Sequence, residues 1–461
     1  MIEPSHSGNS KRKMRGINAL PLMALIFTGG CAHYKSDPLV TDPAILAAPD
    51  VSILSRDAQA IKRPFLRAQA IDFGQPLDAN AVAVLAVIAN PDLKALRARL
   101  GVSDAQAFAA RLLPDPSFSF NFDHLLSGPD NLDNFVGQLG FDIAALRARK
   151  SQEAGANAGR EQVRLDVAWA EWQTASQARL QAMRLVSLTR NIDLIRANAT
   201  STQSLLDRTL RAAGRGDLAA DQVQSARIAA LDATDRLRSA EKDVSTTRGT
   251  LMALLGLAPE TLLQFAPLRM SAPILDPARL FTLASAQRFD LKALAQGYKV
   301  QEAAVRKAVL DQFPTLNLTL TGTRDTTGNK LVGPGISFTL PLWNRNRGGI
   351  AVALATRAQL KAEYEARLFQ TRADIAAAVS GIQIAQKQRD ALAAQIEALE
   401  RFASATGRAA KRGDLSLATA ETAVQSLRDK QIALASVSQA IAEQIIALEL
   451  LTGVPQEDWT K

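Results

Sequence analysis

The sequence has very few of the residues that usually build catalytic or metal centres. It contains one cysteine and three histidines among 461 residues. The histidines, His6, His33 and His124, are far apart along the chain, so their positions indicate neither a metal site nor an acid–base pair. A single thiol forms no internal disulfide. We therefore expect no enzyme, no cofactor and no bound metal.

Aromatic residues are also scarce, at 5% of the sequence. Of the net charge of +9, +3 belongs to residues 1–30, and the remaining basic residues form no block interleaved with aromatics. A nucleic-acid-binding surface is therefore not expected. The abundance of alanine, leucine, glutamine and arginine is typical of long helices that meet through small side chains.

The beginning of the sequence has the pattern of a secretory signal. Basic residues from Lys11 to Arg15 precede an apolar run over 17–27, and small residues then lead to Cys31. This order resembles a bacterial lipoprotein signal, which implies removal of residues 1–30, lipidation of Cys31, with palmitate among the attached chains, and sorting to the outer membrane. The alternative is an unmodified signal peptide beside an incidental cysteine. No later apolar run approaches the roughly 18 residues of a membrane helix, so any membrane crossing is expected to use strands.

One segment occurs twice in the sequence. "RAAGRGDL" begins at Arg211 and "RAAKRGDL" at Arg408, and "DLKAL" at Asp92 recurs at Asp290. Repeats at a nearly constant offset indicate a tandem duplication. The predicted divisions are a signal over 1–30, an N-terminal segment over 31–90, two copies over 91–257 and 289–455, a linker over 258–288 and a tail over 456–461.

Each copy starts with residues that alternate between apolar and polar, the pattern of strands with one apolar face. A Gly/Asp/Asn-rich stretch separates two such runs, so we predict hairpins over 116–143 and 314–342, with the last run extending from Ile336 to Leu342. The polar face of the four strands would carry Ser117, Ser119, Asn121, Gln138, Asp142, Thr315, Asn317, Thr319, Ser337 and Thr339. The opposite face would carry phenylalanine, leucine and isoleucine.

Proline is absent from Asn131 to Ala258 and from Leu342 to Val454, which permits very long helices. Apolar or small residues spaced by three and four predict coiled-coil seams at Leu185, Leu188, Ile192, Ile195, Ala199, Thr202 and Leu206, and at Ile382, Ala385, Leu392, Ile396, Leu399 and Ala403. The distance from each hairpin to the "RGDL" segment corresponds to a helix of about 100 Å.

The repeated octapeptide is predicted to be the reversal point of an antiparallel helical hairpin. Gly216 and Gly413 interrupt the long helices, and Asp217 and Asp414 are expected to cap the first turn of the returning helices. The two tips would lie near 214–218 and 411–415.

A four-stranded open sheet in lipid would leave two edges without backbone partners. Three chains would supply twelve strands, enough to close a water-filled barrel. The expected fold class is mainly α with a small β part: duplicated coiled-coil hairpins forming an α-barrel, and four strands per chain in a trimeric twelve-stranded transmembrane β-barrel. The alternative is a lipid-anchored periplasmic coiled-coil scaffold protein whose hairpins pack as soluble sheets on its own helices.

This arrangement resembles the TolC-type outer-membrane efflux proteins over roughly 91–455. The resemblance is carried by the doubled hairpin-plus-helix plan, the "RGDL" turns, "FPTLNLTL", "ISFTLPLWNRNRGGIAVALATRAQ", "ALLGLAP" and "LELLTGVP". It implies a homotrimer in the bacterial outer membrane that extends into the periplasm, with residues 31–90 and 258–288 in an equatorial belt. It also implies a passive exit duct for a tripartite efflux system, joined to a periplasmic adaptor (membrane fusion) protein and an inner-membrane pump of the resistance-nodulation-division type.

The resemblance further implies that the adaptor docks on the helical tips. Carried onto this sequence, the docking residues are Arg215, Gly216, Asp217, Leu218, Arg412, Gly413, Asp414 and Leu415. Asp207 and Asp221 are candidates for charged residues that bias the closed state of the gate. The exported molecule stays open between a drug-like amphiphile, a heavy-metal ion and a polypeptide.

Overall fold

The computed structural model describes residues 34–39, 50–267 and 276–459. The chain divides into two units, residues 1–47 and 48–461. In the first unit, residues 34–39 form neither helix nor strand. The predicted signal and the candidate lipid anchor Cys31 lie outside the described residues.

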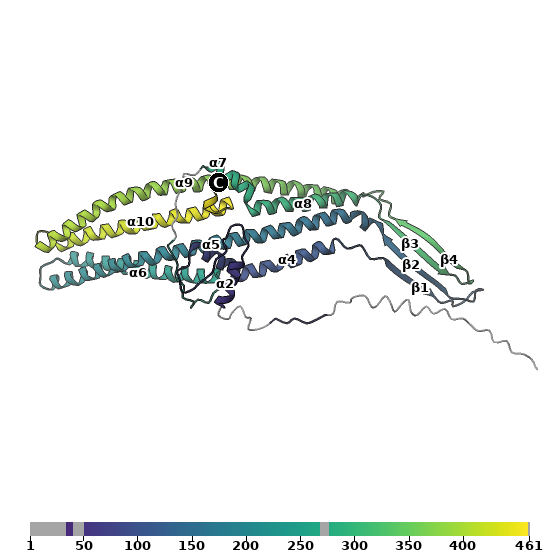
Figure 1. The fold of residues 1–461 in the computed structure, drawn as a ribbon, viewed down its shortest axis with the longest axis horizontal. Coiled ribbons are helices and arrows are strands. Elements are labelled where there is room, and N and C mark those ends of the chain that lie inside the picture. Colours follow the sequence, from purple (N-terminus) through teal and green to yellow (C-terminus); the bar gives the residue numbers. More distant parts are fainter. Residues whose placement is uncertain (1–33, 40–49, 268–275, 460–461) are drawn as a thin grey trace, which may run out of the picture. The chain divides into compact units, whose positions relative to one another are not determined.

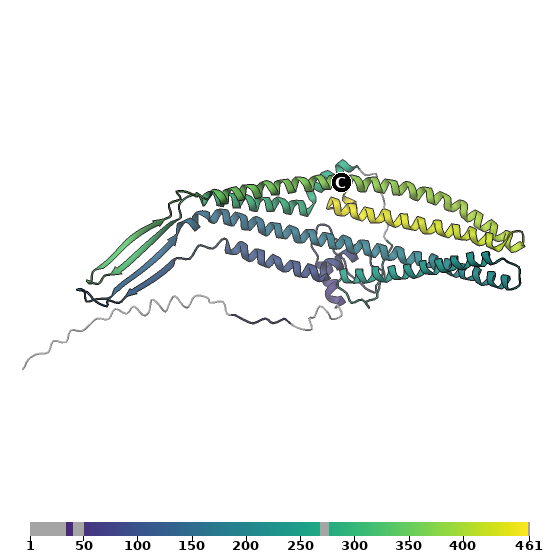
Figure 2. The same cartoon turned by 180° about the vertical axis from the view of Figure 1, so that it is seen from behind.

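The second unit contains two copies of one order of elements (Figures 1 and 2). After α2 (Val51–Ala60), the first copy comprises α3 (Ala79–Ala89), α4 (Pro91–Ala109), β1 (Ser117–Asp123), β2 (Asn134–Asp142), α5 (Ile143–Gly214) and α6 (Ala220–Leu254). The second copy comprises α7 (Pro277–Gln287), α8 (Phe289–Leu310), β3 (Leu316–Arg324), β4 (Lys330–Phe338), α9 (Arg347–Arg412) and α10 (Leu417–Thr452), followed by the short helix η3 (Gln456–Asp458). The chain is therefore mainly helical with one small sheet, as predicted.

The structural correspondence starts at α3 and α7, one helix before the repeated sequences. Both helices have 11 residues and begin after an aspartate that accepts a backbone hydrogen bond, Asp78 from Ala81 at 2.7 Å and Asp276 from Ala278 at 3.0 Å. Helix α3 packs on α5 as α7 packs on α9. Their sequences share few residues, because packing on a helix pair requires apolar side chains rather than identical ones.

The long helices confirm the expectation from the missing prolines. Helix α5 has 72 residues and α9 has 66, each about 100 Å at 1.5 Å per residue. They return as α6 and α10, which pack along them. In the predicted seams Ile192, Leu206, Ile382 and Ala403 are buried, whereas Leu392 is only partly buried.

Helix α10 differs from the prediction that no segment after the signal is apolar enough for a membrane helix. It contains an 18-residue window with a mean hydropathy of 1.4, long and apolar enough to cross a membrane by length and composition alone, and 28% of that window is buried. However, α10 packs along both α9 and α5. Two ion pairs fix it to α5, Arg179–Glu449 at 2.6 Å and Arg184–Glu443 at 3.0 Å. These contacts assign α10 to the helical bundle.

The four strands form one antiparallel sheet in the order β1-β2-β3-β4, and the β2–β3 pair joins the two copies. Residues directly opposite each other in such a sheet point to the same face. The register aligns Ser119 with Gln138 and Gln138 with Thr321, while Phe118 is aligned with Leu139 and Leu139 with Leu320. The pairing therefore places the predicted polar and apolar residues on opposite faces.

The last strand differs from its predicted span. Strand β4 covers Lys330–Phe338, so it begins within the stretch predicted to be a turn and ends before Leu340 and Leu342. Gly333, Pro334 and Gly335 obscured it in the sequence, since these residues usually interrupt strands. They are tolerated because β4 is an edge strand that pairs only with β3 among the described strands.

Each copy closes on itself at a glycine. Gly256 and Gly453, which follow α6 and α10, have φ angles of +61° and +75°. Asn90, before α4, donates to the carbonyl of Leu254 at 3.0 Å, and Arg288, before α8, donates to the equivalent carbonyl of Leu451 at 3.3 Å. A Cβ on Gly256 would lie 2.5 Å from the carbonyl oxygen of Ala89, so glycine is required there for backbone conformation and for space.

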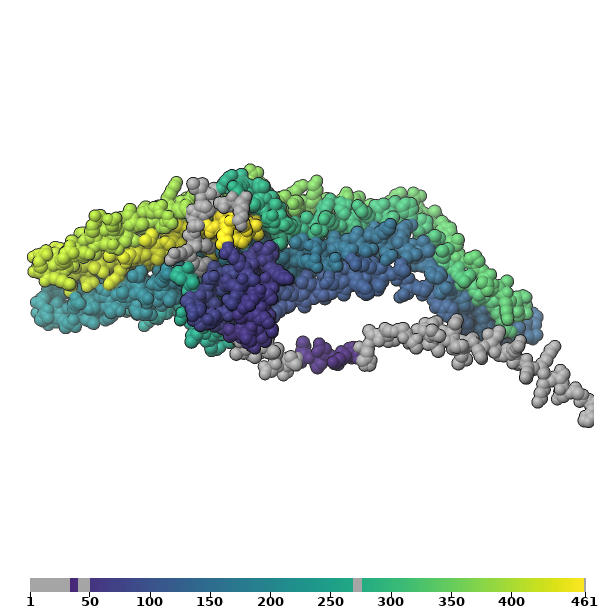
Figure 3. All heavy atoms as spheres, viewed as in Figure 1, coloured from purple at the N-terminus to yellow at the C-terminus, as the bar shows by residue number. Residues whose placement is uncertain are grey.

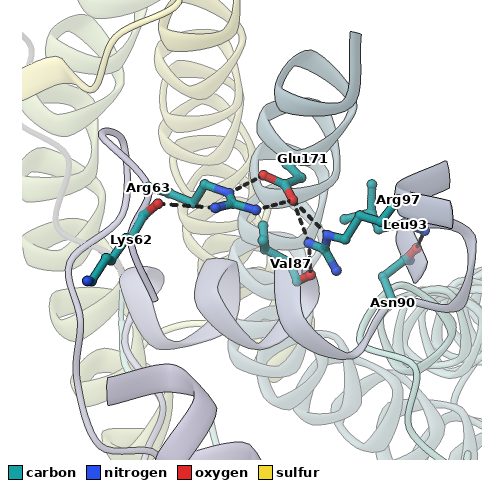
Figure 4. A network of polar contacts seen from close by, with 7 residues as sticks. All are labelled: Lys62, Arg63, Val87, Asn90, Leu93, Arg97 and Glu171. Atoms are coloured by element: carbon teal, nitrogen blue, oxygen red, sulfur yellow. Dashed lines mark hydrogen bonds and ion pairs between the residues drawn. The ribbon is translucent and has the colours of Figure 1, made fainter. Parts of the chain in front are cut away.

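A buried carboxylate holds the N-terminal segment on α5 (Figure 4). Glu171 is 1% exposed and accepts hydrogen bonds from both Arg63, after α2, and Arg97 in α4. Arg97 also donates to the carbonyl of Val87 in α3 at 2.6 Å. One carboxylate thus ties three separate elements to the long helix, and Figure 3 shows residues 50–90 (purple) gathered into a compact patch.

Burial raises the pKa of Glu171, but the hydrogen bonds from Arg63 and Arg97 outweigh it, so the net pKa lies below the ordinary value of 4.5. Because the folded-state pKa is lowered, the carboxylate stabilises the fold fully above about pH 4.5. That contribution is lost as the pH falls through the lower folded-state value.

We predict that Glu171→Gln lowers the free energy of unfolding by about 2 kcal/mol at pH 7, because two guanidinium groups lose their charged partner. Glu241→Gln, which removes an exposed carboxylate 3.7 Å from Arg196, is the matched control and should change stability by less than about 0.5 kcal/mol. Thermal unfolding measured by circular dichroism tests both. The difference between wild type and Glu171→Gln should shrink below pH 4, and a constant difference would contradict the assigned charge state.

We predict that Gly256→Ala destabilises the chain by about 2 kcal/mol or more, since the added methyl meets backbone and the φ angle is left-handed. Gly249→Ala, inside α6 with no atom within 4 Å of the new Cβ, is the control. That change should raise stability slightly, because alanine is the better helix former. Equal melting temperatures for the two variants would show that the chain at Gly256 has room for a methyl group beside the carbonyl of Ala89.

Candidate functional site

The two repeated octapeptides lie at neighbouring helical tips, as predicted. One tip joins α5 to α6 and the other joins α9 to α10 (Figures 1 and 2). Near the tips, Ser201 of α5 donates to Glu421 of α10 at 2.7 Å. The duplication therefore places two copies of the same turn side by side at the end of the bundle that is opposite the sheet.

Both tips end their long helix in the same Schellman motif. Gly216 donates to the carbonyl of Ala213 and Asp217 to that of Ala212, at 2.9 and 3.0 Å. In the second tip, Gly413 and Asp414 make the equivalent bonds to Ala410 and Ala409, at 3.1 and 3.0 Å. This motif requires a left-handed residue, and the φ angles are +81° at Gly216 and +86° at Gly413. Turn geometry therefore explains both glycines.

The two aspartates do not cap the returning helices, contrary to the prediction. The N-cap of α6 is Ala219, which makes no side-chain bond, and the N-cap of α10 is Ser416, which accepts from Thr419 at 3.1 Å. Asp217 and Asp414 lie two residues earlier, because the Schellman motif uses their N–H groups to end the preceding helix. Their carboxylates pair instead with Arg215 and Arg412, each at 2.9 Å.

The leucine of each "RGDL" makes none of the hydrogen bonds of the turn. Leu218 and Leu415 are 37% and 41% exposed. The arginine–aspartate pair and the glycine complete the helix reversal, so the leucines remain as two equivalent apolar groups on the surface of the tips. Such groups are suited to contact with an apolar surface of a partner helix.

The candidate gate residues lie near the first tip without contacting each other. Asp207 accepts a hydrogen bond from Gln203 at 3.1 Å, one turn earlier in α5. Asp221, in the first turn of α6, accepts from the backbone of Gln222 at 2.9 Å. Within residues 50–267 and 276–459, neither carboxylate forms an ion pair. Any restraint that they exert on a gate would thus act on groups outside the described part of this chain.

The sheet has an apolar face that the described helices leave open. Phe118, Phe120 and Phe122 are 71%, 58% and 51% exposed, and Ile336 and Phe338 are similarly exposed. Burying such side chains would be favourable by roughly 1.5–3 kcal/mol each, so a partner surface or lipid is expected here. This exposure disfavours the alternative of a sheet packed on the chain's own helices.

The bundle has two sides on which no described helix packs, and the sequence did not predict them. We call these sides the open flanks. Among the described elements, α9 packs on α7, α8 and α10, whereas α4 and α6 pack on α5 and not on α9. Strand β4 leads into α9, and α4 leads into β1, so each open sheet edge continues into an open helix flank (Figures 1 and 2). Large exposed apolar residues outside the seams mark these flanks: Val352, Phe369, Ile384 and Phe402 on α9, and Val102, Phe108, Ile228 and Leu231 on α4 and α6.

The described residues offer no group that suggests catalysis. His124 lies in the loop after β1, with its Nδ1 2.8 Å from Asp133. Across the described ranges, no group of three or more histidine, cysteine, aspartate or glutamate side chains could hold a metal ion. His6 and His33 lie outside these ranges.

Comparisons with known proteins agree with this architecture. Residues 280–454 match the outer membrane efflux protein family. No curated protein matches the sequence at a significant level. Among solved structures, the outer membrane channel CmeC of Campylobacter jejuni is 18% identical, with a TM-score of 0.68 over 83% of this chain and 87% of CmeC.

Two further channels have the same fold. The outer membrane protein VceC of Vibrio cholerae is 17% identical, with a TM-score of 0.68 over 82% of this chain and 96% of VceC. The outer membrane channel MtrE of Neisseria gonorrhoeae, solved in an open state, is 18% identical, with a TM-score of 0.62 over 81% of this chain and 88% of MtrE. The second copy therefore matches the outer membrane efflux protein family, and the chain has the fold of these outer-membrane proteins, as the resemblance to the TolC-type family predicted.

Proposed function

We propose that this protein is the passive exit duct of a tripartite efflux system in the bacterial outer membrane. The observation that carries the proposal is the open four-stranded sheet, which exposes an apolar face and two free edges next to helices of about 100 Å. A strand edge that enters lipid needs partners for its N–H and C=O groups. Copies of the same chain supply them when β4 of one copy pairs with β1 of the next.

Three copies give twelve strands and a homotrimer. The helices favour the same closure, because α9 of one copy would meet α4 and α6 of the next while β4 meets β1. The exposed apolar residues of these flanks would then be buried in one continuous heterologous interface. The polar face of the sheet, rich in serine, threonine and asparagine, would line a water-filled path.

The tips are proposed to dock a periplasmic adaptor that links the duct to an inner-membrane pump of the resistance-nodulation-division type. Leu218 and Leu415 would provide the apolar contacts, and Arg215–Asp217 and Arg412–Asp414 would hold both turns in the same shape. Asp207 and Asp221 are proposed to bias the gate through groups of neighbouring copies. Cys31 is proposed to carry the lipid anchor.

We predict that the purified protein is a trimer that conducts ions across a planar bilayer. Size-exclusion chromatography with light scattering gives the oligomeric state, and single-channel recording gives the conductance. A monomer that leaves the bilayer silent would exclude the duct and favour the scaffold alternative.

We predict that Phe120→Asp and Ser119→Asp, on adjacent residues of opposite faces, have opposite outcomes. Losing a lipid-buried phenylalanine and gaining a carboxylate on that face costs about 2 kcal/mol in each of three subunits, so Phe120→Asp should reduce the membrane-inserted trimer at least about tenfold. Ser119→Asp should assemble normally and make the channel more selective for cations, because it adds three carboxylates to the lumen. Outer-membrane fractionation and reversal potentials measure the two effects, and the reverse pattern would mean that the faces are exchanged.

We predict that Leu218→Asp combined with Leu415→Asp abolishes export while the trimer still forms and conducts. The Schellman bonds do not involve either side chain, so the turns should persist, whereas charge on both leucines opposes apolar docking. The control is Leu218→Met with Leu415→Met, which should export normally. Export is measured as the resistance or substrate accumulation of cells that produce the complete pump, and wild-type export by the aspartate variant would remove the leucines from docking.

A further inference from the structure

The apolar face of the sheet ends in a row that carries two cations. The register pairs Phe122 with Phe135, Phe135 with Arg324, and Arg324 with Lys330, so these four residues lie side by side across the strands. We call them the terminal row. It lies at the hairpin loops, at the end of the sheet that is far from the helices (Figure 1).

The remaining rows of this face contain no charged residue. Moving from the terminal row toward the helices, they consist of Phe120, Gly137, Gly322 and Val332; Phe118, Leu139, Leu320 and Pro334; Phe141, Leu318 and Ile336; and Leu316 and Phe338. Phe338 follows Lys330 by eight residues, or about 26 Å along the strand. Because the strands of outer-membrane barrels tilt by about 35–45°, this length spans roughly 20 Å of an apolar band that is about 25 Å tall. In a membrane-spanning sheet the two cations would therefore lie at the loop end of the apolar band, next to the polar headgroups.

Neither cation has a bonded partner in the described part of the chain. Across residues 50–267 and 276–459, Arg324 and Lys330 form no hydrogen bond from their side chains and no ion pair. The carboxylates of the adjoining loops, in contrast, are occupied within the hairpins: Asp123 by Asn134, Asp130 by Thr326, Asp133 by Leu125 and His124, and Asp325 by Thr327 and Asn329.

The charge of Arg324 acts on one carboxylate of the adjoining loops, that of Asp133. A hydrogen bond from the backbone of Leu125 lowers the pKa of Asp133, and the charge of Arg324 makes a smaller contribution in the same direction. Both hydrogen bonds of Asp133 reach the same oxygen, Oδ1, and neither comes from Arg324, whose side-chain donors form no hydrogen bond within the described residues.

We propose that the terminal row binds the phosphate groups of a phosphorylated glycolipid in the outer leaflet of the membrane. This inference rests on the proposed function, since it requires a sheet that spans the membrane with its hairpin loops outward. Arg324 offers a planar set of donors to phosphate and Lys330 a compact charge, while Phe122 and Phe135 pack where aromatic rings favour the interface. A lipid is favoured over a soluble anion because the row continues directly into the apolar face, where the acyl chains would lie.

The test compares lipid binding to the full-length trimer by native mass spectrometry, with bisphosphorylated lipid A and its dephosphorylated form as probes. We expect Arg324→Gln combined with Lys330→Gln to bind the phosphorylated lipid about 25-fold more weakly, since each basic group near an anionic surface contributes about fivefold. Arg324→Lys with Lys330→Arg keeps both charges and should bind within about twofold of wild type. Lys299→Gln with Arg306→Gln, an equal loss of charge at exposed residues of α8, which belongs to neither open flank, should bind as the wild type does.

Single-channel conductance separates the two ways in which the inference can fail. If the glutamine variant conducts and binds phosphorylated lipid as tightly as the wild type, the inference is wrong and the duct stands. If millimolar inorganic phosphate displaces the lipid, the row is a site for soluble anions and the inference is also wrong. If the wild type forms no conducting trimer, the proposed function fails and the inference fails with it.

Discussion

Unpaired backbone groups at the two edges of the sheet are the constraint on which the rest of the structure depends. Water can satisfy the backbone groups of an edge strand in solution but lipid cannot, so the proposed insertion of this apolar sheet into a membrane requires a partner strand at each edge. The helices are incomplete along the same flanks, because β4 continues into α9 and β1 is preceded by α4. One interface between copies would therefore close the strands and the helices together.

The duplication explains how a single chain can be built with matching flanks. Each copy closes through the same contact. The side chain of the residue before α4 or α8 donates to the last turn of the return helix, Asn90 to Leu254 of α6 and Arg288 to Leu451 of α10. The copies are then joined by β2 with β3 and by α5 with α10. Joining the two copies covers one side of each copy. Because the copies are similar, the two sides left uncovered have the same architecture as the two sides that are already paired. The same geometry can thus be repeated between chains.

The sequence predicted the helices and strands that have a clear local periodicity. It did not predict features that depend on which elements pack against each other in the folded chain. Alternation identified three strands and the absence of proline identified α5 and α9, since both signals are properties of single segments. Strand β4 was misplaced because Gly333 and Pro334 resemble a turn unless one knows that the strand lies at an edge. The open flanks were missed for the same reason: Phe369 and Phe402 are outside the seam, but only the packing of α9 reveals that nothing in the described chain covers them.

Some residues of the repeated motif at the helical tips are explained by the fold, and others are not. Near-identity of two octapeptides at a distance of 197 residues suggests a conserved contact, yet most of it follows from the turn itself. Glycine supplies the left-handed residue of the Schellman motif, and the arginine and aspartate on either side form an ion pair across it. The leucine, like the exposed Arg211 and Arg408 that open the octapeptides, takes no part in the hydrogen bonds of the turn. The glycine would be expected in any helical hairpin that ends in this turn, because the motif needs a left-handed residue there. A repeated, partly exposed apolar residue that makes none of the turn's hydrogen bonds is the part of the motif that contact with a partner would explain.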